Sequence, residues 1–176
     1  MMILKLVRTP GVYLLGFMGS GKSTVGQLLA NRLGWDFFDL DDDIEEQAGK
    51  SIPEIFAQDG EPKFREIERE ALTRRIRMVQ AGHAMVLALG GGACIGETCM
   101  ERLSNNGVTV FLDCDFDTLA ERVAQFEHRP LAKDPEQFRK LYESRRPSYQ
   151  LANHRVDAAS GTPETVAATI AALGIF

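Results

Sequence analysis

The sequence has little of several features that would place the protein in a particular class. No stretch approaches the roughly 20 consecutive apolar residues of a membrane-spanning helix, although 44% of the 176 residues are hydrophobic. Positive charge is not in excess, because the formal net charge is −5. Non-specific nucleic-acid binding normally needs a basic surface. We therefore expect no membrane and no nucleic-acid partner, and any anion-binding site must be local.

Cysteine is also scarce, with only Cys94, Cys99 and Cys114. Their number is odd and no two have C-x-x-C spacing, which favours reduced thiols in a cytoplasm over disulfides or a zinc site. We predict that all three pack as small apolar side chains. The apolar run 12–15 is too short for a signal peptide and leads directly into a phosphate-binding motif, so we expect a cytoplasmic protein.

No internal repeat and no linker rich in Pro, Gly or Ser divides the chain, so we expect one domain over residues 1–176. Short apolar runs alternate with amphipathic segments, which predicts an α/β protein with a parallel sheet. The expected strands are 12–15, 37–38, 85–89, 108–112 and about 155–157. The expected helices are 25–33, 62–80 with Gly82 as C-cap, one capped by Asp115 that ends near 124, and one from Thr162-Pro163 to about 172. Residues 125–137 lack periodicity and read as a mobile flap.

The strongest motif follows the first expected strand and matches G-x-x-x-x-G-K-S: Gly16-Phe17-Met18-Gly19-Ser20-Gly21-Lys22-Ser23. Its glycines let successive backbone N–H groups face one anion, and the helix that follows adds its positive N-terminal dipole. Lys22 can reach the β- and γ-phosphates of a nucleotide, and the Ser23 hydroxyl is placed for Mg²⁺. The motif predicts a nucleotide site but does not distinguish a kinase from other nucleotide-binding proteins.

Carboxylates follow the second expected strand, where α/β sheets place their ligands. If strand geometry persists through Asp41, Asp39 and Asp41 project to the same side, one toward a metal and one toward an acceptor hydroxyl. For Asp42 and Asp43 we favour capping of the next helix.

Further candidates lie in the expected long helix and after the third strand. Arg65 can be steadied by Glu68 and can bind a carboxylate with two hydrogen bonds, although a surface ion pair is equally compatible with this spacing. Gly90, Gly91 and Gly92 can bring backbone N–H groups close to a small anion, or they can be a simple turn.

Arginines also accumulate late in the chain, and in an acidic protein this suggests bound anions. They are Arg122, Arg129, Arg145, Arg146 and Arg155.

Taken together, these residues resemble the shikimate kinase family from Val12 to the last helix. Besides the phosphate-binding loop, the resemblance rests on the Asp39-x-Asp41 pair, Ile55-Phe56, Gly60-Glu61, Phe64-Arg65 with Glu68, Gly90–Gly92, Arg129-Pro130-Leu131, and Arg145 before Pro147 and Tyr149. It implies a three-layer α/β/α sandwich with a short lid. The implied reaction is transfer of the γ-phosphoryl group of ATP to the 3-hydroxyl of shikimate, in aromatic amino-acid biosynthesis. The resemblance also implies that the protein is a monomer.

The resemblance also implies roles for individual residues. Lys22, Asp41 and Arg129 would be catalytic, and Ser23 and Asp39 would hold Mg²⁺. ATP would contact Gly19, Ser20, Gly21, Lys22, Ser23, Thr24, Arg122, Arg129 and Arg155. Shikimate would contact Asp41, Arg65, Gly90, Gly91, Gly92 and Arg145, with Glu68 behind Arg65 and with Ile52, Phe56 and Phe64 as an apolar wall. Whether Arg145 or Arg146 reaches the carboxylate stays open, although spacing to Pro147 favours Arg145.

Two other interpretations fit the phosphate-binding loop. A gluconate kinase or nucleoside-monophosphate kinase would share it but need a different acceptor pocket. A regulatory nucleotide-binding module would share it without catalysis, which Lys22, Ser23, Asp39, Asp41 and Arg129 together argue against.

Overall fold

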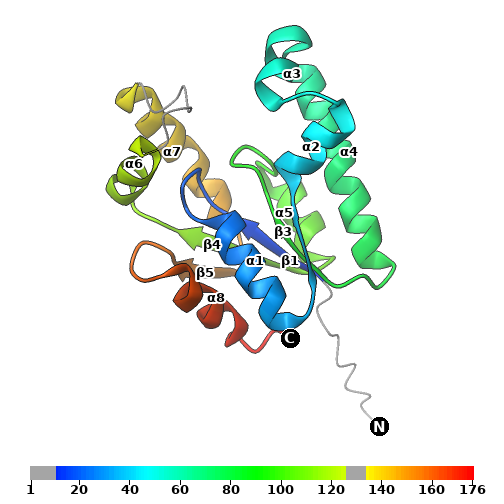
Figure 1. Cartoon of the computed structure of the whole chain (residues 1–176), viewed down its shortest axis with the longest axis vertical. Coiled ribbons are helices and arrows are strands. Elements are labelled where there is room, and N and C mark those ends of the chain that lie inside the picture. Colours follow the sequence, from blue (N-terminus) through cyan, green and yellow to red (C-terminus); the bar gives the residue numbers. More distant parts are fainter. Residues whose placement is uncertain (1–10, 126–133) are drawn as a thin grey trace.

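The computed structural model describes residues 11–125 and 134–176, which form five parallel strands flanked by helices (Figure 1). The strand order is β2-β3-β1-β4-β5. The strands are β1 (Gly11–Leu15), β2 (Asp36–Asp39), β3 (Met85–Ala88), β4 (Val108–Asp113) and β5 (His154–Asp157). The predicted α/β class and all five strands are confirmed, with strand bounds that differ by at most one residue at either end.

The helices follow the predicted alternation. They are α1 (Lys22–Leu33), α2 (Leu40–Ala48), α3 (Ile52–Gln58), α4 (Gly60–Gln80), α5 (Glu97–Ser104), α6 (Phe116–Ala124), α7 (Pro135–Tyr149) and α8 (Pro163–Ala171). The predicted caps Asp115 and Thr162 accept hydrogen bonds from Thr118 N and Thr165 N. α4 ends at Gln80, as predicted; Ala81 is its C-cap, and Gly82, which was predicted for that position, follows directly with φ 93°.

The predicted flap, residues 125–137, is described only in part, and its last residues are helical. Residues 126–133 lie outside the described residues, and this includes Arg129. The end of the predicted segment is helical: α7 begins at Pro135, where proline suits the first turn, and the Asp134 carboxylate accepts hydrogen bonds from Glu136 N and Gln137 N at 3.1 Å each. The cap therefore outweighs the low periodicity at this point.

Each face of the sheet is covered by its own helices. Alternate residues of β1 point to opposite faces, so Tyr13 and Leu15 join a core with α4, α5 and α7, whereas Val12 and Leu14 join a core with α1 and α8. Strands buried on both faces are typical of a three-layer α/β/α sandwich. This confirms the predicted architecture.

The carboxyl ends of the parallel strands lie along one edge of the sheet, with β2 and β3 on one side of the central strand β1 and β4 and β5 on the other. The loops after β1, β2, β3 and β5 therefore meet at this edge, where α/β sheets bind ligands. In Figure 1, α2, α3 and the start of α4 stand on one side of this edge and α6 and α7 on the other.

A buried ion pair fixes α2 on α4. Asp43, 4% exposed, accepts hydrogen bonds from Arg75 Nε at 2.7 Å and Arg75 Nη2 at 2.5 Å. The same guanidinium lies over the Phe38 ring, 3.4 Å from its centroid. The prediction that Asp43 caps α2 is therefore wrong: Asp39 is the N-cap, and Asp43 turns inward because a helical period places it beside α4.

We expect Asp43→Ala to lower the free energy of unfolding by about 3 to 5 kcal/mol, because it leaves the Arg75 charge buried and unpaired. The matched control is Glu66→Ala, which breaks the Lys63–Glu66 pair whose side chains are 49% and 50% exposed. That change should cost less than about 1 kcal/mol. Urea denaturation of both variants measures the contrast, and equal losses would contradict the assigned role of burial.

Candidate functional site

The phosphate-binding loop joins β1 to α1 with the backbone geometry that its glycines permit. Gly16, Gly19 and Gly21 have φ of 151°, 84° and 92°. At Gly19 a methyl group would also lie 2.9 Å from Val123 Cγ2, so both conformation and space require glycine. No side chain caps the start of α1. The first N–H groups of the helix therefore face the loop and can bind an anion.

Two polar side chains organise the loop from within. Lys22 Nζ donates to Gly16 O at 2.8 Å and Phe17 O at 3.1 Å, which curls the loop around the ammonium group. Ser20 Oγ is the one buried side-chain oxygen or nitrogen without a hydrogen-bond partner among the residues that the structure describes. A polar atom in this state is rare in a folded protein and is consistent with a site built for a polar ligand.

Ser23 and Asp39 bring two oxygen ligands together beside this loop. Ser23 Oγ donates to Asp39 Oδ2 at 2.6 Å, while Asp39 Oδ1 accepts from Asp41 N at 3.1 Å and so caps α2. Mg²⁺ prefers oxygen ligands and typically binds one or two protein groups together with water and nucleotide phosphates. The pair fits such an ion. Within 11–125 and 134–176, no cluster of three or more His, Cys, Asp or Glu side chains offers a metal site of another kind.

Asp41 reaches the same place by a route that differs from the predicted one. The strand ends at Asp39 and helix α2 begins at Leu40, so Asp41 is a first-turn helical residue and the expectation of persistent strand geometry is wrong. Both carboxylates nevertheless line one cavity. Burial, with the nearby charge of Asp39, raises the pKa of Asp41 to about 6, and the Lys22 ammonium offsets this only in part. A carboxylate with this pKa can accept a proton near neutral pH.

The glycine turn after β3 leaves room for charged side chains. A methyl group on Gly90 would lie 2.5 Å from Asp41 Oδ1, and one on Gly92 would lie 3.0 Å from Arg145 Nη2 and 3.2 Å from both terminal nitrogens of Arg65. None of the three glycines has a positive φ, so what they supply is space. The turn therefore brings Asp41, Arg65 and Arg145 to one short stretch of backbone.

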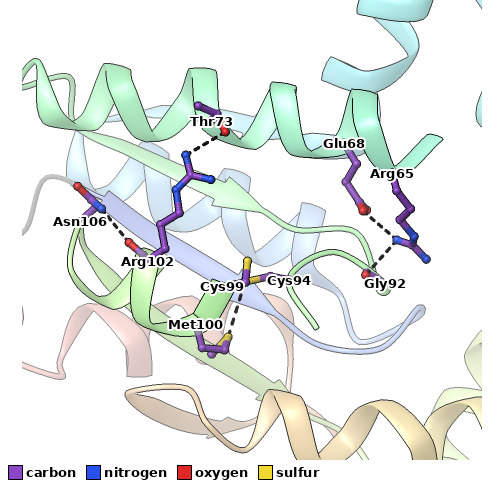
Figure 2. The surroundings of a disulfide bond; sticks show 9 residues. All are labelled: Arg65, Glu68, Thr73, Gly92, Cys94, Cys99, Met100, Arg102 and Asn106. Atoms are coloured by element: carbon purple, nitrogen blue, oxygen red, sulfur yellow. Dashed lines mark hydrogen bonds and ion pairs between the residues drawn. A yellow bond between two sulfur atoms is a disulfide. The ribbon is translucent and has the colours of Figure 1, made fainter. Parts of the chain in front are cut away.

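Arg65 is held on this turn from two sides. Its Nη1 donates to Glu68 Oε2 at 2.8 Å and to Gly92 O at 3.1 Å, as Figure 2 shows. Glu68 is only 8% exposed, so this is not the solvated surface pair that the spacing left possible. Arg65 Nη2 and Nε also donate to Glu61 Oε1, and the guanidinium lies 5.2 Å from the Phe64 ring centroid. These contacts orient a cation toward the glycine turn.

The structure separates the two neighbouring arginines of α7. Arg145 reaches Gly91 and Gly92, whereas Arg146 points to β4 and pairs with Asp113. Tyr149, one turn after Arg145, donates its hydroxyl proton to Gly91 O. Arg145 is therefore the residue of the pair at the glycine turn, as its spacing to Pro147 favoured.

The predicted apolar wall forms beside Arg65. The Phe56 and Phe64 rings lie with centroids 4.6 Å apart, and Ile52 packs on the same core. Phe64 is 6% exposed and Phe56 is 40% exposed, so Phe56 presents an open aromatic face. α3, which carries Ile52 and Phe56, begins with a capping box between Ser51 and Glu54.

A cavity of about 480 Å³ connects the phosphate-binding loop with Asp39, Asp41, Gly90 and Gly91. Its far side is formed by α6 with its C-cap, by the loop after β5 and by the first turn of α8, which supply Arg122, Gln125, Ala158, Gly161, Pro163 and Val166. Arg122 links the two walls, because its Nη2 donates to Ala158 O at 2.9 Å and its Nη1 to Gly19 O at 3.4 Å. All of the predicted residues from Gly19 to Thr24 line this cavity.

Other parts of the site differ from the sequence prediction. Arg155 lies in a neighbouring hollow with Asp113, Asp157 and Arg146, and it is not among the residues that line the cavity. Sequence reasoning also missed the loop 158–163. Its signal was available, because the Ser160-Gly161 turn sits between the last strand and the Thr162 cap, at the ligand-binding edge of the sheet.

The prediction of three reduced cysteines is wrong for two of them. Cys94 and Cys99 form a disulfide directly after the glycine turn (Figure 2), and their Cα atoms are 5.2 Å apart. Spacing in sequence did not exclude this, because the turn before α5 folds Cys94 back against the first turn of the helix. Cys94 has φ 59°, the one positive value of a non-glycine residue in the described chain. Cys114 is a free, buried thiol, and burial raises its pKa to about 11, as expected of a packing residue.

The fold and the phosphate-binding loop define a kinase of the P-loop class, and the comparisons with known proteins agree. A family model described as shikimate kinase matches residues 18–173. A shikimate kinase of Sulfurihydrogenibium sp. is 41% identical over 156 residues, which cover 88% of this chain and 92% of the relative. The chain belongs to the shikimate kinase family.

Solved structures extend this result to three dimensions. The crystal structure of a shikimate kinase from Aquifex aeolicus matches with a TM-score of 0.81 and 37% identity, covering 92% of this chain and 94% of the other. A shikimate kinase from Acinetobacter baumannii, determined in complex with shikimate, matches with a TM-score of 0.82 and 34% identity, covering 94% of this chain and 92% of the other.

No described helix is long and apolar enough to cross a membrane.

The raised pKa of Asp41 predicts a pH-dependent gain in stability for Asp41→Asn. The native state holds the Asp41 proton up to about pH 6, whereas the unfolded chain releases it near pH 3.8, so wild-type stability falls as pH rises through this window. The variant should be more stable than wild type by up to about 3 kcal/mol at pH 8, with the advantage shrinking toward pH 4.

Urea denaturation across that pH range measures this effect. The control is Asp36→Asn, which changes an exposed acid at the start of β2 and should show no such trend. A stability difference for Asp41→Asn that does not vary with pH would contradict the burial of this carboxylate.

Reduction of the Cys94–Cys99 disulfide should destabilise the protein modestly, because the bond closes a loop of only a few residues. The loss of loop-closure entropy predicts about 2 kcal/mol, or a fall in melting temperature of about 4 to 8 °C with a dithiol reductant. A Cys99→Ser variant should melt at the same temperature with and without the reductant. Titration of free thiols in denatured protein should find one before reduction and three after; three before reduction would contradict the disulfide.

Proposed function

We propose that the protein transfers the γ-phosphoryl group of ATP to the 3-hydroxyl of shikimate, giving shikimate 3-phosphate and ADP for the synthesis of chorismate and the aromatic amino acids. The carrying observation is that guanidinium groups from α4 and α7 meet at Gly92, next to Asp41 and the phosphate-binding loop. Two arginines suit the carboxylate of an acid polyol better than a neutral sugar or a nucleotide base. The family relative solved with shikimate supports the same acceptor.

The nucleotide would lie with its phosphates on Gly19 to Thr24 and with its base toward Arg122 and the loop 158–163. Lys22 can leave its two carbonyl acceptors at 2.8 and 3.1 Å to contact the β- and γ-phosphates. Ser23 and Asp39 would hold Mg²⁺, which neutralises charge on the transferring phosphoryl group. Their hydrogen bond of 2.6 Å keeps both oxygens on the cavity side of α1 and α2.

The acceptor would lie against the glycine turn, within reach of Asp41, Arg65 and Arg145. Arg65 and Arg145 would bind its carboxylate, Glu68 would keep Arg65 in place, and Ile52, Phe56 and Phe64 would contact its ring. Asp41 would orient the reacting hydroxyl and accept its proton. Phosphoryl transfer depends mainly on alignment and on stabilising charge, so this proton transfer contributes less than the cations around the phosphates.

The proposal extends to the domain organisation, the oligomeric state and the location of the protein. We infer a single domain over the whole chain that acts as a cytoplasmic monomer on small molecules. The net charge of −5 and the apolar cores that cover both faces of the sheet are compatible with a soluble enzyme.

An ADP-release assay with Mg-ATP tests the function. Shikimate, gluconate and AMP are offered separately, with an acceptor-free control. We expect turnover with shikimate alone. Turnover with gluconate or AMP instead would keep the nucleotide site and refute the acceptor, and silence with all three despite ATP binding would favour a regulatory module.

Arg65→Ala tests the acceptor clamp. It should raise the KM for shikimate about 10- to 100-fold, because a charge-assisted pair of hydrogen bonds to the carboxylate is lost, and change the KM for ATP less than about twofold. Arg74→Ala, an exposed residue of the same helix, is the matched control and should change neither. Equal increases for both substrates would refute a specific role in acceptor binding.

A further inference from the structure

A buried carboxylate outside the acceptor site holds the helix that carries Arg145. Asp113 is the last residue of β4 and is 7% exposed. Its oxygens accept a paired hydrogen bond from Arg146, with Nη1 to Oδ1 at 2.7 Å and Nη2 to Oδ2 at 3.1 Å. This two-point geometry fixes both the position and the rotation of the guanidinium, which a single contact would not do.

Further contacts close this cluster. Arg146 Nη1 also donates to the Tyr142 hydroxyl, which donates to Cys114 O at 3.1 Å. Arg155 of β5 pairs with Asp113 as well, but its side chain is 64% exposed, compared with 27% for Arg146. Because exposed pairs contribute little, Arg146 is the partner through which Asp113 acts most strongly.

Helix α7 needs a stabilising side-chain contact at this position. Pro147 lies inside α7 and has no N–H, so the helix lacks a backbone hydrogen bond directly after Arg146. Side-chain contacts hold α7 on both sides of this point: Arg146 binds β4, and Tyr149 packs on Phe111 with ring centroids 5.4 Å apart and donates to Gly91 O. Neighbouring helical residues point about 100° apart. Fixing Arg146 on Asp113 therefore fixes where Arg145 points.

The Asp113–Arg146 pair also determines which of the two neighbouring arginines faces the glycine turn. Arg145 and Arg146 are adjacent, and both carry a guanidinium group that suits an acceptor carboxylate. Asp113 neutralises Arg146 and turns it toward β4, which leaves Arg145 at Gly91 and Gly92. None of the residues assigned to substrate or nucleotide binding supplies this function.

We infer that Asp113, acting through Arg146, is a positioning residue for the acceptor site: it holds α7 so that Arg145 meets the acceptor carboxylate beside Arg65. The inference rests on the proposed function, because it needs Arg145 to bind the acceptor. It assigns no contact with substrate to Asp113 or Arg146 themselves.

Steady-state kinetics with ATP and shikimate test it, on Asp113→Asn, Arg146→Gln and the double variant. Each single change should raise the KM for shikimate at least fivefold, while kcat and the KM for ATP stay within about twofold of wild type. The KM for shikimate of the double variant should be no higher than that of the more impaired single variant, because both changes remove one shared interaction. Asp113→Glu, which keeps a carboxylate, should recover most of the loss.

Two controls separate positioning from a general loss of structure. Asp117→Asn alters a carboxylate that is 87% exposed and pairs with Arg139 at 3.8 Å, and it should change no constant. Arg155→Gln removes the other partner of Asp113 and should leave the KM for shikimate within about twofold. If Asp113→Asn does not fold, Arg146→Lys, which keeps the charge but cannot bind both carboxylate oxygens, should still raise the KM for shikimate alone.

The outcomes distinguish this inference from the proposed function. If wild type does not phosphorylate shikimate, the proposed function fails and the inference fails with it. If wild type phosphorylates shikimate but the variants show an unchanged KM for shikimate, equal increases for both substrates, or multiplying effects in the double variant, the inference alone is overturned.

Discussion

The approach of two guanidinium groups to the backbone of Gly91 and Gly92 is the constraint on which the rest of the site depends. A methyl group on Gly92 would lie 3.0 Å from Arg145 Nη2 and 3.2 Å from the terminal nitrogens of Arg65, so glycine leaves space here for both guanidinium groups and is not needed for a special φ. The cations belong to α4 and α7, which stand on opposite sides of the strand ends in Figure 1. The glycine turn is where these two sides of the molecule meet.

Other contacts in the structure hold the helices around the glycine turn in place. Asp43 and Arg75 fasten α2, and with it Asp41, to α4. On the other side of the turn, Arg102 of α5 donates to Thr73 of α4 at 2.9 Å, and the Cys94–Cys99 disulfide closes the segment between the glycines and α5 (Figure 2). Of these contacts only Asp43–Arg75 is a buried charge pair, and the cost of desolvating its charges offsets much of their attraction, so its net contribution to stability is small. We interpret these contacts as the means by which an acidic protein presents a small, local set of cations.

Much of this was predictable from the sequence because the decisive signals are local. The phosphate-binding loop is one continuous motif, and the strands, the Asp115 and Thr162 caps and the order of elements follow from apolar periodicity and capping chemistry. Arg65 and Glu68 share one helix, so their spacing alone suggested contact. The expected acceptor residues within the described chain do gather at one end of the sheet.

What could not be predicted depends on contacts between distant segments. Asp43 meets Arg75 across 32 residues and Arg146 meets Asp113 across 33, and neither partner is marked by local spacing. The disulfide depends on how tightly the chain turns before α5, which composition does not reveal. Arg155 was placed at the nucleotide by analogy, whereas the nearest buried carboxylate, Asp113, draws it into a separate hollow.

The most direct test of the account compares shikimate with its methyl ester as acceptor. The ester keeps every hydroxyl but removes the negative charge that Arg65 and Arg145 would bind. We predict that kcat/KM for the ester is at least about 100-fold lower, mainly through KM, and that Arg65→Ala narrows the difference between the two acceptors. Equal use of acid and ester by the wild-type protein would contradict the assignment of the two arginines to the acceptor carboxylate.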